Sequence, residues 1–520
     1  MSRFKRFTHS LLSGYMQLAV NSLFTLVTVR LALHYLSDDD YGLWMPATVI
    51  AGYIALADFG LSGAAARILI DYKDHQKPEE YGGIIQTSAW VGLSQAALIF
   101  LVGTLLAFVL GPLLHIPAKL EREFFWLVIG QCGVTAAMFA TRIVALILTA
   151  NQRFDVNNYS GAFALPVNCG VMWWGFAHGL GVFSMLWGQA AGVISSLTIN
   201  CIGCYRLKLF PRKGQWGRPS WEKFRELFVF GRDVFLFMMG NQFVNFSQTL
   251  LLTRLVGLKE ALTWGICTRA YAILLQVISR IFEFSTSALA EMMVRGEREQ
   301  LLRRFREIEG LSVNLAVAAA VLFAVANGPF VEVWTAGRIK WSPWNDLLLA
   351  VWLVICITVR MHAGLVGQAK AFRFLRYLYF LEGLAFIGLT LLLHRFGGIT
   401  LMLMISIGCS LGCTFRYSLW RTCEYFHLSW GDLARWHRDT LVLAGTVAPA
   451  GLLVWWFTRN LPALQRLIVE ITILGIWTAC MFLRYGLGCS LRADACRHAP
   501  SWAKPILDRM GFANPEDSDK

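Results

Sequence analysis

Residues 17–31, QLAVNSLFTLVTVRL, return in altered form as residues 241–255, NQFVNFSQTLLLTRL. In this alignment the polar residues Gln17, Asn21, Thr25 and Arg30 meet Asn241, Asn245, Thr249 and Arg254. Farther along, an acid-Phe-x-x-Ser-x-x-Ala pattern begins at Asp58 and returns at Glu283. Apolar residues repeat by chance in such segments, but an ordered series of polar residues rarely does. We therefore interpret the chain as a duplicated domain whose polar residues lie inside apolar segments.

The composition is that of a membrane protein. Hydrophobic residues make up 56% of the chain and charged residues 15%, against roughly 25% charged in ordinary globular proteins. Nearly charge-free segments follow one another, each near or above the ~20 residues that a helix needs to cross the hydrocarbon core. We expect an all-α polytopic protein with fourteen transmembrane helices. They are predicted at 11–36, 42–69, 83–111, 123–149, 158–177, 180–204, 227–256, 260–290, 311–333, 346–368, 374–393, 397–420, 440–457 and 464–486.

The basic residues predict the orientation and the organisation of the chain. Most of the 47 Lys and Arg residues fall on the side that holds both termini, which the positive-inside rule places in the cytoplasm. The predicted parts are a cytoplasmic N-terminus (1–10), a six-helix bundle (11–204), a basic cytoplasmic linker (205–226), a second six-helix bundle (227–425), an extra two-helix unit (426–486) and a cytoplasmic tail (487–520). The net charge of +14 follows from this topology, so no nucleic-acid partner is expected.

No motif of an enzyme or of a metal centre stands out in the sequence. There is no P-loop, no nucleophile motif and no pair of carboxylates in an aqueous loop. Cys201 and Cys204 form a C-x-x-C pair, but no second pair of ligands lies near it in sequence. We therefore expect no catalytic residues, no bound metal and no cofactor. None of the 12 cysteines falls in a predicted external loop, so disulfides are not expected either.

The predicted span at 260–290 carries the most informative charges. Its polar residues recur at helical spacing and share one face: Arg269, Gln276, Arg280, Glu283, Ser287 and Glu291. The opposite face is apolar, with Tyr271, Leu274, Ile278 and Phe282. Ionisable residues are costly in hydrocarbon and usually face a bundle interior or a water-filled cavity, so we expect the polar face to line a cavity. The alternative is an Arg280–Glu283 pair buried by packing, which leaves Arg269 and Gln276 unexplained.

Two acids and a set of arginines are the candidate functional residues. Asp58 and Glu283 occupy equivalent places in the repeat. Each is a candidate for proton or ion coupling, or for charge pairing. Asp58 could titrate during transport, or it could pair with Arg30, Arg142 or Arg280. The candidate substrate-binding residues are Arg30, Arg142, Arg254, Arg269, Gln276 and Arg280. Guanidinium groups bind phosphate bidentately, so such a cavity suits a phosphate or diphosphate. Arginines near span ends could instead extend to the headgroups, and Arg360 is a further arginine inside a span.

Three stretches carry a resemblance to a known family. They are LSDDDYGLW (36–44) followed by DFGLS (58–62), TRAY (268–271) followed by ALAEM (288–292), and GQAKAFR (367–373). The chain in this way resembles the MOP superfamily of multidrug, oligosaccharidyl-lipid and polysaccharide exporters, and within it the polysaccharide-export and O-antigen flippase branch. The resemblance covers roughly residues 10–425. Members of the family often have a proline near positions 288–292, and this chain has none there.

The resemblance implies two pseudo-symmetric six-helix bundles around a central cavity that opens alternately to the two sides of the membrane. Duplicated transporters commonly bind substrate where their halves meet. In flippase members the substrate is an oligosaccharide on a polyprenyl diphosphate, which moves from the cytoplasmic to the periplasmic leaflet. The implied location is the bacterial inner membrane, and the implied pathway is cell-envelope polysaccharide synthesis, as of the lipopolysaccharide O-antigen. The implied partners are this lipid-linked glycan and membrane lipids, with a polysaccharide polymerase or glycosyltransferases of the pathway as further candidates.

Two other functions remain open at this point. The first is a cation-coupled exporter of drugs or other small organic cations from the same superfamily. A cavity rich in arginine argues against cationic substrates, and fourteen spans differ from the twelve typical of multidrug members. The second is a non-transporting membrane scaffold for a polysaccharide synthase complex. The polar face of 260–290 argues against it, because a scaffold has no need for charges in hydrocarbon.

Overall fold

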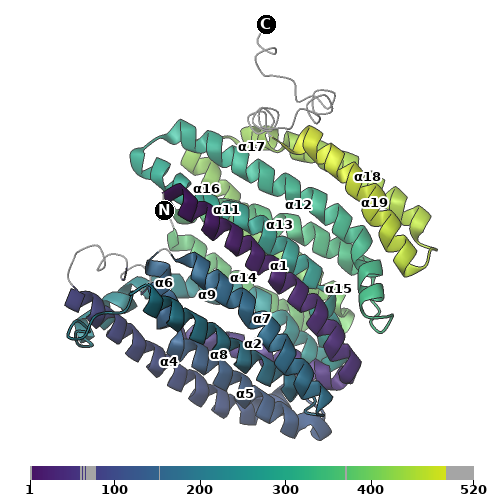
Figure 1. Cartoon of the computed structure of the whole chain (residues 1–520). Helices are drawn as coiled ribbons and strands as arrows, with labels where there is room; N and C mark the ends of the chain where they lie inside the picture. The colour runs from purple at the N-terminus through teal and green to yellow at the C-terminus, as the bar shows by residue number, and fades with distance from the viewer. Residues whose placement is uncertain are drawn as a thin grey trace. The chain divides into compact units, whose positions relative to one another are not determined.

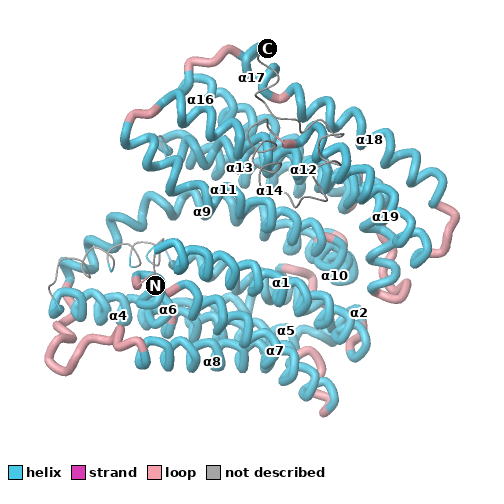
Figure 2. Tube along the Cα trace, turned by 45° about the horizontal axis from the view of Figure 1, so that its top comes forward, coloured by secondary structure: helices cyan, strands magenta, loops and turns pink. Residues whose placement is uncertain are grey.

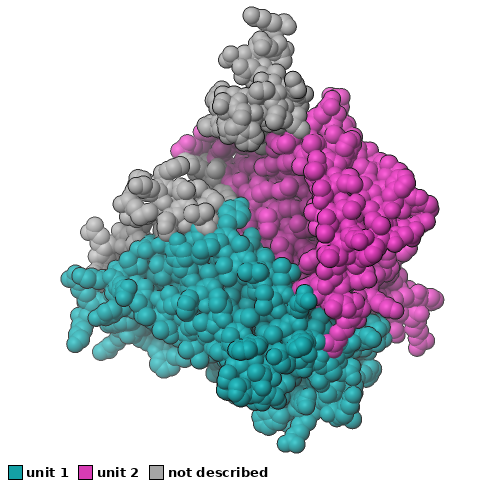
Figure 3. Space-filling model, turned by 45° about the vertical axis from the view of Figure 1, so that its right-hand side comes forward, with its two compact units in different colours: residues 1–262 teal, residues 263–520 magenta. Residues whose placement is uncertain are grey.

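The computed structural model describes residues 3–58, 61, 65, 69, 78–151, 153–368 and 372–487 (Figure 1). Every regular element within these residues is helical, and no strand occurs among them (Figure 2). The predicted all-α fold is therefore confirmed. The chain divides into two compact units, residues 1–262 and 263–520 (Figure 3). The predicted bundle boundaries, which follow the sequence repeat, stay a prediction.

The first unit consists of long helices that pack side by side. They are α1 (Arg3–Tyr35), α2 (Asp38–Ile54), α4 (Pro78–Leu113), α5 (Ala118–Thr141), α6 (Ile143–Ala150), α7 (Phe154–Ala177), α8 (Phe183–Arg206) and α9 (Trp221–Leu255). α7 lies along both α1 and α8, α4 lies along α5, and α2 contacts α5 and α9. The Ser37 side chain accepts a hydrogen bond from the Asp40 N–H at the start of α2, which satisfies one of the unpaired helix donors. A single 3₁₀ turn, Ala55–Asp58, follows α2 and brings Asp58 toward α4.

The second unit is organised around α12. Its helices are α11 (Arg269–Arg295), α12 (Arg298–Trp334), α13 (Pro343–Gln368), α14 (Phe372–Leu393), α15 (Ile399–Ser410), α16 (Arg416–Phe426), α17 (Trp430–Trp436), α18 (Arg438–Thr458) and α19 (Ala463–Met481). α12 packs against α11 and α13, and also against α18 and α19, the helices of the predicted extra two-helix unit. Val317, Leu443 and Val447 are buried between α12 and α18. The extra two-helix unit, α18 and α19, is therefore packed against one long helix of the second unit, α12.

The predicted span at 260–290 is a bent pair of helices. α10 (Leu258–Cys267) meets α11 at an angle of 41° around Thr268. α11 then continues without a break to Arg295, through 288–292. The absence of the family proline explains this continuity, because proline is the residue that most often breaks a helix.

Among the residues that the structure describes, ten helices are long and apolar enough to cross a membrane, and the α10–α11 pair would make eleven. The chain is therefore a multi-pass membrane protein, while the total of fourteen stays a prediction. α9, a helix of 35 residues, coincides with a further predicted span. Large apolar side chains such as Trp90, Phe108 and Phe457 are exposed, as expected for surfaces that face lipid.

Candidate functional site

The two faces of α11 differ in exposure in the way that its sequence predicts. Gln276, Arg280 and Glu283 are exposed, and Arg269 is half-buried where the helix begins. On the opposite face Tyr271, Ile278 and Phe282 are buried and Leu274 is half-buried. The side chains of Ser287 and Glu291 lie outside the described residues. α11 thus presents a polar face while its apolar face packs within the second unit.

α11 is held closely against α13 by its apolar face. A Cβ atom at Gly364 of α13 would overlap the ring of Phe282, so the glycine permits the close approach of the two helices. Near the other end, the rings of Tyr271 and Trp352 stack with centroids 5.8 Å apart. The Tyr271 hydroxyl also donates a hydrogen bond to Sγ of Cys356 at 3.6 Å. These contacts fix the polar face of α11 beside α13.

Glu283 binds two arginines, one on its own helix and one on α13. Nη1 of Arg280 donates to Oε2 of Glu283 at 2.7 Å, and Nη2 of Arg360 donates to Oε1 at 2.7 Å. The exposed fractions of the three side chains are 45% for Arg280, 36% for Glu283 and 49% for Arg360. Because exposed pairs stabilise a fold weakly, this group is poorly explained as a packing device. Two guanidinium groups and one carboxylate leave a net positive charge at an open surface.

The equivalent acid of the first unit is more enclosed. Nη1 of Arg142 donates to Oδ1 of Asp58, and Nη2 of Arg142 donates to Oε1 of Gln95. Nε2 of Gln95 in turn donates to the backbone oxygen of Asp58 at 3.0 Å. The side chains of Arg142 and Asp58 are 17% and 19% exposed, and the Arg142 guanidinium lies 4.7 Å from the centroid of the Phe139 ring. Of the three candidate partners of Asp58, the structure thus shows a pair with Arg142.

The two ion pairs occupy corresponding places in the repeat. Asp58 and Glu283 are matched by the repeat, and each lies in the second predicted span of its half. Arg142 and Arg360 each lie in the fourth predicted span. An acid of the second span therefore binds an arginine of the fourth span in both halves. The sequence singled out both acids but marked Arg360 only as one more arginine in a span, because residue spacing does not encode a contact between two helices.

The remaining predicted arginines have different surroundings. Arg30 is exposed on α1. Nη1 of Arg254, at the end of α9, donates to the backbone oxygen of Leu113 at the end of α4, and Nδ1 of His115 lies 3.3 Å from the backbone oxygen of Arg254. Arg254 therefore joins two helix ends. The buried Nε of Arg269 has no hydrogen-bond partner within the described part of the chain.

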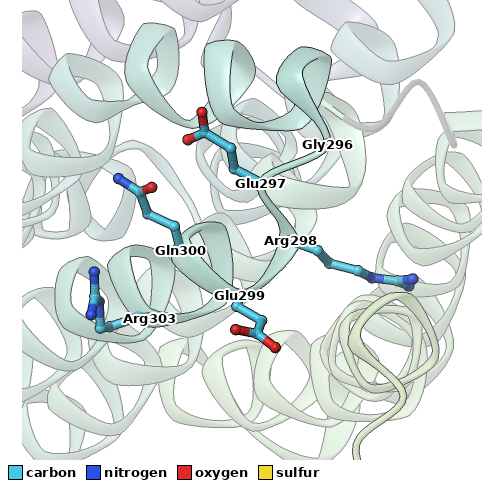
Figure 4. A pocket seen from close by; sticks show the side chains of 6 residues that line it. All are labelled: Gly296, Glu297, Arg298, Glu299, Gln300 and Arg303. Atoms are coloured by element: carbon cyan, nitrogen blue, oxygen red, sulfur yellow. The ribbon is translucent and has the colours of Figure 1, made fainter.

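A surface hollow of about 650 Å³ lies elsewhere, at the turn between α11 and α12 (Figure 4). Its lining consists of Gly296, Glu297, Arg298, Glu299, Gln300 and Arg303. The side chains point in different directions, with Arg298 and Arg303 on separate sides (Figure 4). Charges of both signs that do not converge make a poor ligand site. We therefore place the candidate site on the polar face of α11 with Arg360.

Comparison with known proteins agrees with this architecture. Residues 10–295 match a family described as polysaccharide biosynthesis protein, and no curated protein matches the sequence. Among solved structures, the lipid II flippase MurJ in an inward closed conformation is 11% identical, with 92% of this chain and 99% of that chain covered and a TM-score of 0.61.

Two further solved structures are members of the MOP superfamily. An inward-facing multidrug resistance MATE transporter is 14% identical, with 80% of this chain and 99% of that chain covered and a TM-score of 0.60. A MOP superfamily transporter from Pyrococcus furiosus is 15% identical, with coverage of 81% and 96% and a TM-score of 0.54. At these identities the likeness to all three structures shows the fold.

Proposed function

Because this chain belongs to the polysaccharide biosynthesis protein family, within the MOP exporter superfamily, we propose that it is a flippase for a polyprenyl-diphosphate-linked oligosaccharide. It moves the headgroup of this lipid from the cytoplasmic to the periplasmic leaflet of a bacterial inner membrane, by alternating access and for cell-envelope polysaccharide synthesis. Both termini lie in the cytoplasm. One observation carries the proposal: Arg280 and Arg360 converge on Glu283 at an exposed polar face.

The chemistry of this group suits a diphosphate. A guanidinium has five N–H donors, and in each of these two arginines the hydrogen bond to Glu283 uses only one of them. The remaining donors can bind phosphate oxygens with charge-assisted hydrogen bonds. An anionic headgroup cannot cross bare hydrocarbon without a very large desolvation cost, so a cationic path through the protein is what its transfer requires.

Glu283 has a defined part in this proposal. When no lipid is bound, its carboxylate accepts hydrogen bonds from both guanidinium groups and offsets the repulsion between them. A diphosphate takes its place, and the carboxylate rebinds the arginines when the lipid leaves. Arg269 and Gln276, on the same face of α11, extend the polar path along the helix. Asp58 and Arg142, which are more enclosed and bound to Gln95, hold the helices of the first unit together.

The similar structures support both a lipid and a drug as substrate. MurJ is described as a lipid II flippase, whereas the MATE transporter is described as a multidrug resistance transporter. The charge of the site distinguishes the two possibilities, because a net positive site repels organic cations. We therefore favour the lipid-linked glycan over a cationic drug.

Reconstitution into proteoliposomes tests the function. A fluorescent polyprenyl-diphosphate-linked oligosaccharide is placed in both leaflets, and an impermeant reductant then reports how fast the inner pool becomes accessible. We expect rapid exchange with the wild type and exchange at the protein-free rate with Arg360→Ala. Arg435→Ala, which removes an exposed arginine outside the spans, is the matched control. Export of an organic cation without lipid exchange would assign the protein to drug transport, and the absence of both activities would favour the scaffold.

A further inference from the structure

Three ionisable side chains from distant parts of the sequence meet in the second unit. Glu309 lies on α12, His362 lies on α13, and His437 lies between α17 and α18 (Figure 1). The exposed fraction is 1% for Glu309, 0% for His362 and 21% for His437. Their facing nitrogen and oxygen atoms all lie within 4.8 Å of one another. Buried charges of this kind need a partner, so the position of each hydrogen matters.

The ring of His437 is oriented by the backbone. Its Nδ1 lies 2.9 Å from the backbone oxygen of Leu433, and since a carbonyl only accepts, Nδ1 carries the hydrogen. Nε2, on the other side of the ring, lies 3.1 Å from Oε1 of Glu309. In the neutral ring this nitrogen presents a lone pair. A lone pair therefore faces a carboxylate oxygen unless a cation or a second proton lies between them.

The ring of His362 leads to the same arrangement. The Thr422 hydroxyl donates its single hydrogen to the backbone oxygen of Ser418 at 3.0 Å. The same hydroxyl oxygen therefore accepts a hydrogen bond from Nδ1 of His362, which lies 3.0 Å away. Nε2 of His362 is buried, makes no hydrogen bond within the described residues and lies 3.8 Å from Oε1 of Glu309. Two ring lone pairs and one carboxylate oxygen thus point toward a common centre.

We propose that Glu309, His362 and His437 bind one divalent transition-metal cation of the zinc class. Two imidazoles and one carboxylate form a donor set that zinc commonly takes, with bonds of about 2.0–2.2 Å and a tetrahedral geometry. Tetrahedral bonds of that length separate the ligand atoms by about 3.3 Å. The Nε2–Oε1 distances of 3.1 and 3.8 Å lie on either side of this value. Three protein ligands leave one position for water.

The surroundings of the cluster are those of a metal site. Each histidine donates its other ring N–H to an oxygen, of Leu433 or of Thr422, which is how metal-binding imidazoles are usually oriented. Nε1 of Trp436 donates to Oε2 of Glu309 at 2.9 Å and holds the carboxylate in place. The ring of Phe305 lies 5.6 Å from that of His362 and forms an apolar wall. The partly exposed His437 is the route by which an ion enters.

A metal at this point would join three separate segments. Its ligands come from α12, from α13 and from the junction that leads into α18. The ion would therefore fasten the extra two-helix unit to the bundle that carries Arg360. No short ligand motif marks these residues, which is why the sequence predicted no metal.

Cobalt binding to the full-length, tag-free protein in detergent tests the site. After treatment with a chelator, Co²⁺ is titrated and its visible d–d absorption is followed, and zinc content is measured separately by mass spectrometry. We expect one equivalent of metal in the wild type. Removal of one ligand by His437→Ala or Glu309→Gln should weaken binding by more than the roughly 100-fold that loss of a residue supporting a ligand can cost. His394→Ala removes a half-buried histidine of the 3₁₀ turn His394–Phe396, far from the cluster in sequence, and should bind like the wild type.

Thermal unfolding provides a second readout. Zinc should raise the unfolding temperature of the wild type and of His394→Ala, and it should leave that of His437→Ala unchanged. Absence of the cobalt absorption in the wild type, which does not depend on how any variant folds, would overturn the proposal. Equal binding by the wild type and both ligand variants would also overturn it. The cluster would then be a carboxylate held by protonated imidazoles.

Discussion

Arg360 of α13 binds Glu283 of α11, with Nη2 and Oε1 2.7 Å apart. The corresponding pair in the other half of the chain is Arg142 with Asp58. The two halves of the chain thus share an ion pair between corresponding spans, as well as a corresponding set of helices. The two links differ in exposure, since the Asp58 pair is enclosed while the Glu283 pair is open. We infer that the enclosed pair supports the fold and that the arginines of the open group, Arg280 and Arg360, bind substrate in place of Glu283.

Arg269→Ala and Arg280→Ala should each abolish lipid exchange in proteoliposomes, with both variants still inserted in the membrane. Each removes a cation from the polar face of α11, and a hydrogen bond to a charged group contributes about 1.5–3 kcal/mol. Membrane insertion is measured by extraction and gel filtration, and exchange by the reductant assay. Activity that survives both substitutions would refute the assignment of this face.

Glu283→Gln should bind the diphosphate lipid more tightly and turn over more slowly. Without the carboxylate the lipid no longer competes for Arg280 and Arg360, and we expect the dissociation constant to fall by about tenfold, equivalent to about 1.4 kcal/mol. Binding is measured by fluorescence with a labelled polyprenyl diphosphate, and Glu297→Gln serves as a control at an exposed turn. Weaker binding by Glu283→Gln would mean that the carboxylate itself helps to hold the lipid.

Arg142→Ala should lower the stability of the protein, because it leaves Asp58 and Gln95 without their shared donor. Removing one member of an enclosed ion pair costs roughly 3 kcal/mol. The exchange of charges in Asp58→Arg with Arg142→Asp should recover part of this loss. Thermal unfolding followed by tryptophan fluorescence measures both variants. If Arg142→Ala unfolds like the wild type but is inactive, the pair acts in transport rather than in the fold.

Gly364→Ala should reduce both stability and lipid exchange. The new methyl group overlaps the Phe282 ring, so the ring or α11 itself must shift, and we expect this shift to disturb the neighbouring Glu283–Arg360 pair. Gly388→Ala is the matched control, since nothing lies within 4 Å of a Cβ at that position of α14 and alanine favours a helix by about 1 kcal/mol. Equal behaviour of the two variants would show that the close approach is unimportant.

The sequence predicted the class of the fold well, because membrane helices are marked by their apolar length and the duplication by its polar residues. It also predicted the two faces of α11, since exposed Gln276 and buried Ile278 lie at helical spacing. These features are local. The bend at Thr268 was not predicted, because α10 and α11 together are apolar enough to be taken as one span.

Contacts between distant segments were predicted only in part. The sequence offered three arginines as partners of Asp58, and packing selects Arg142. It also grouped Arg254 with the substrate-binding residues, whereas the described contact of its guanidinium is with the end of α4. The Glu309, His362 and His437 cluster could not be seen at all, because three helical segments must pack before these residues meet.

Substrate protection of single cysteines on α11 tests the central claim most directly. In a variant without the native cysteines, Gln276→Cys and Ile278→Cys are labelled with a membrane-impermeant thiol reagent, with and without a polyprenyl diphosphate. We predict that residue 276 is labelled rapidly, that the lipid slows this labelling, and that residue 278 is protected throughout. Equal labelling at both positions, or labelling at 276 that the lipid leaves unchanged, would contradict a water-filled path that binds the diphosphate.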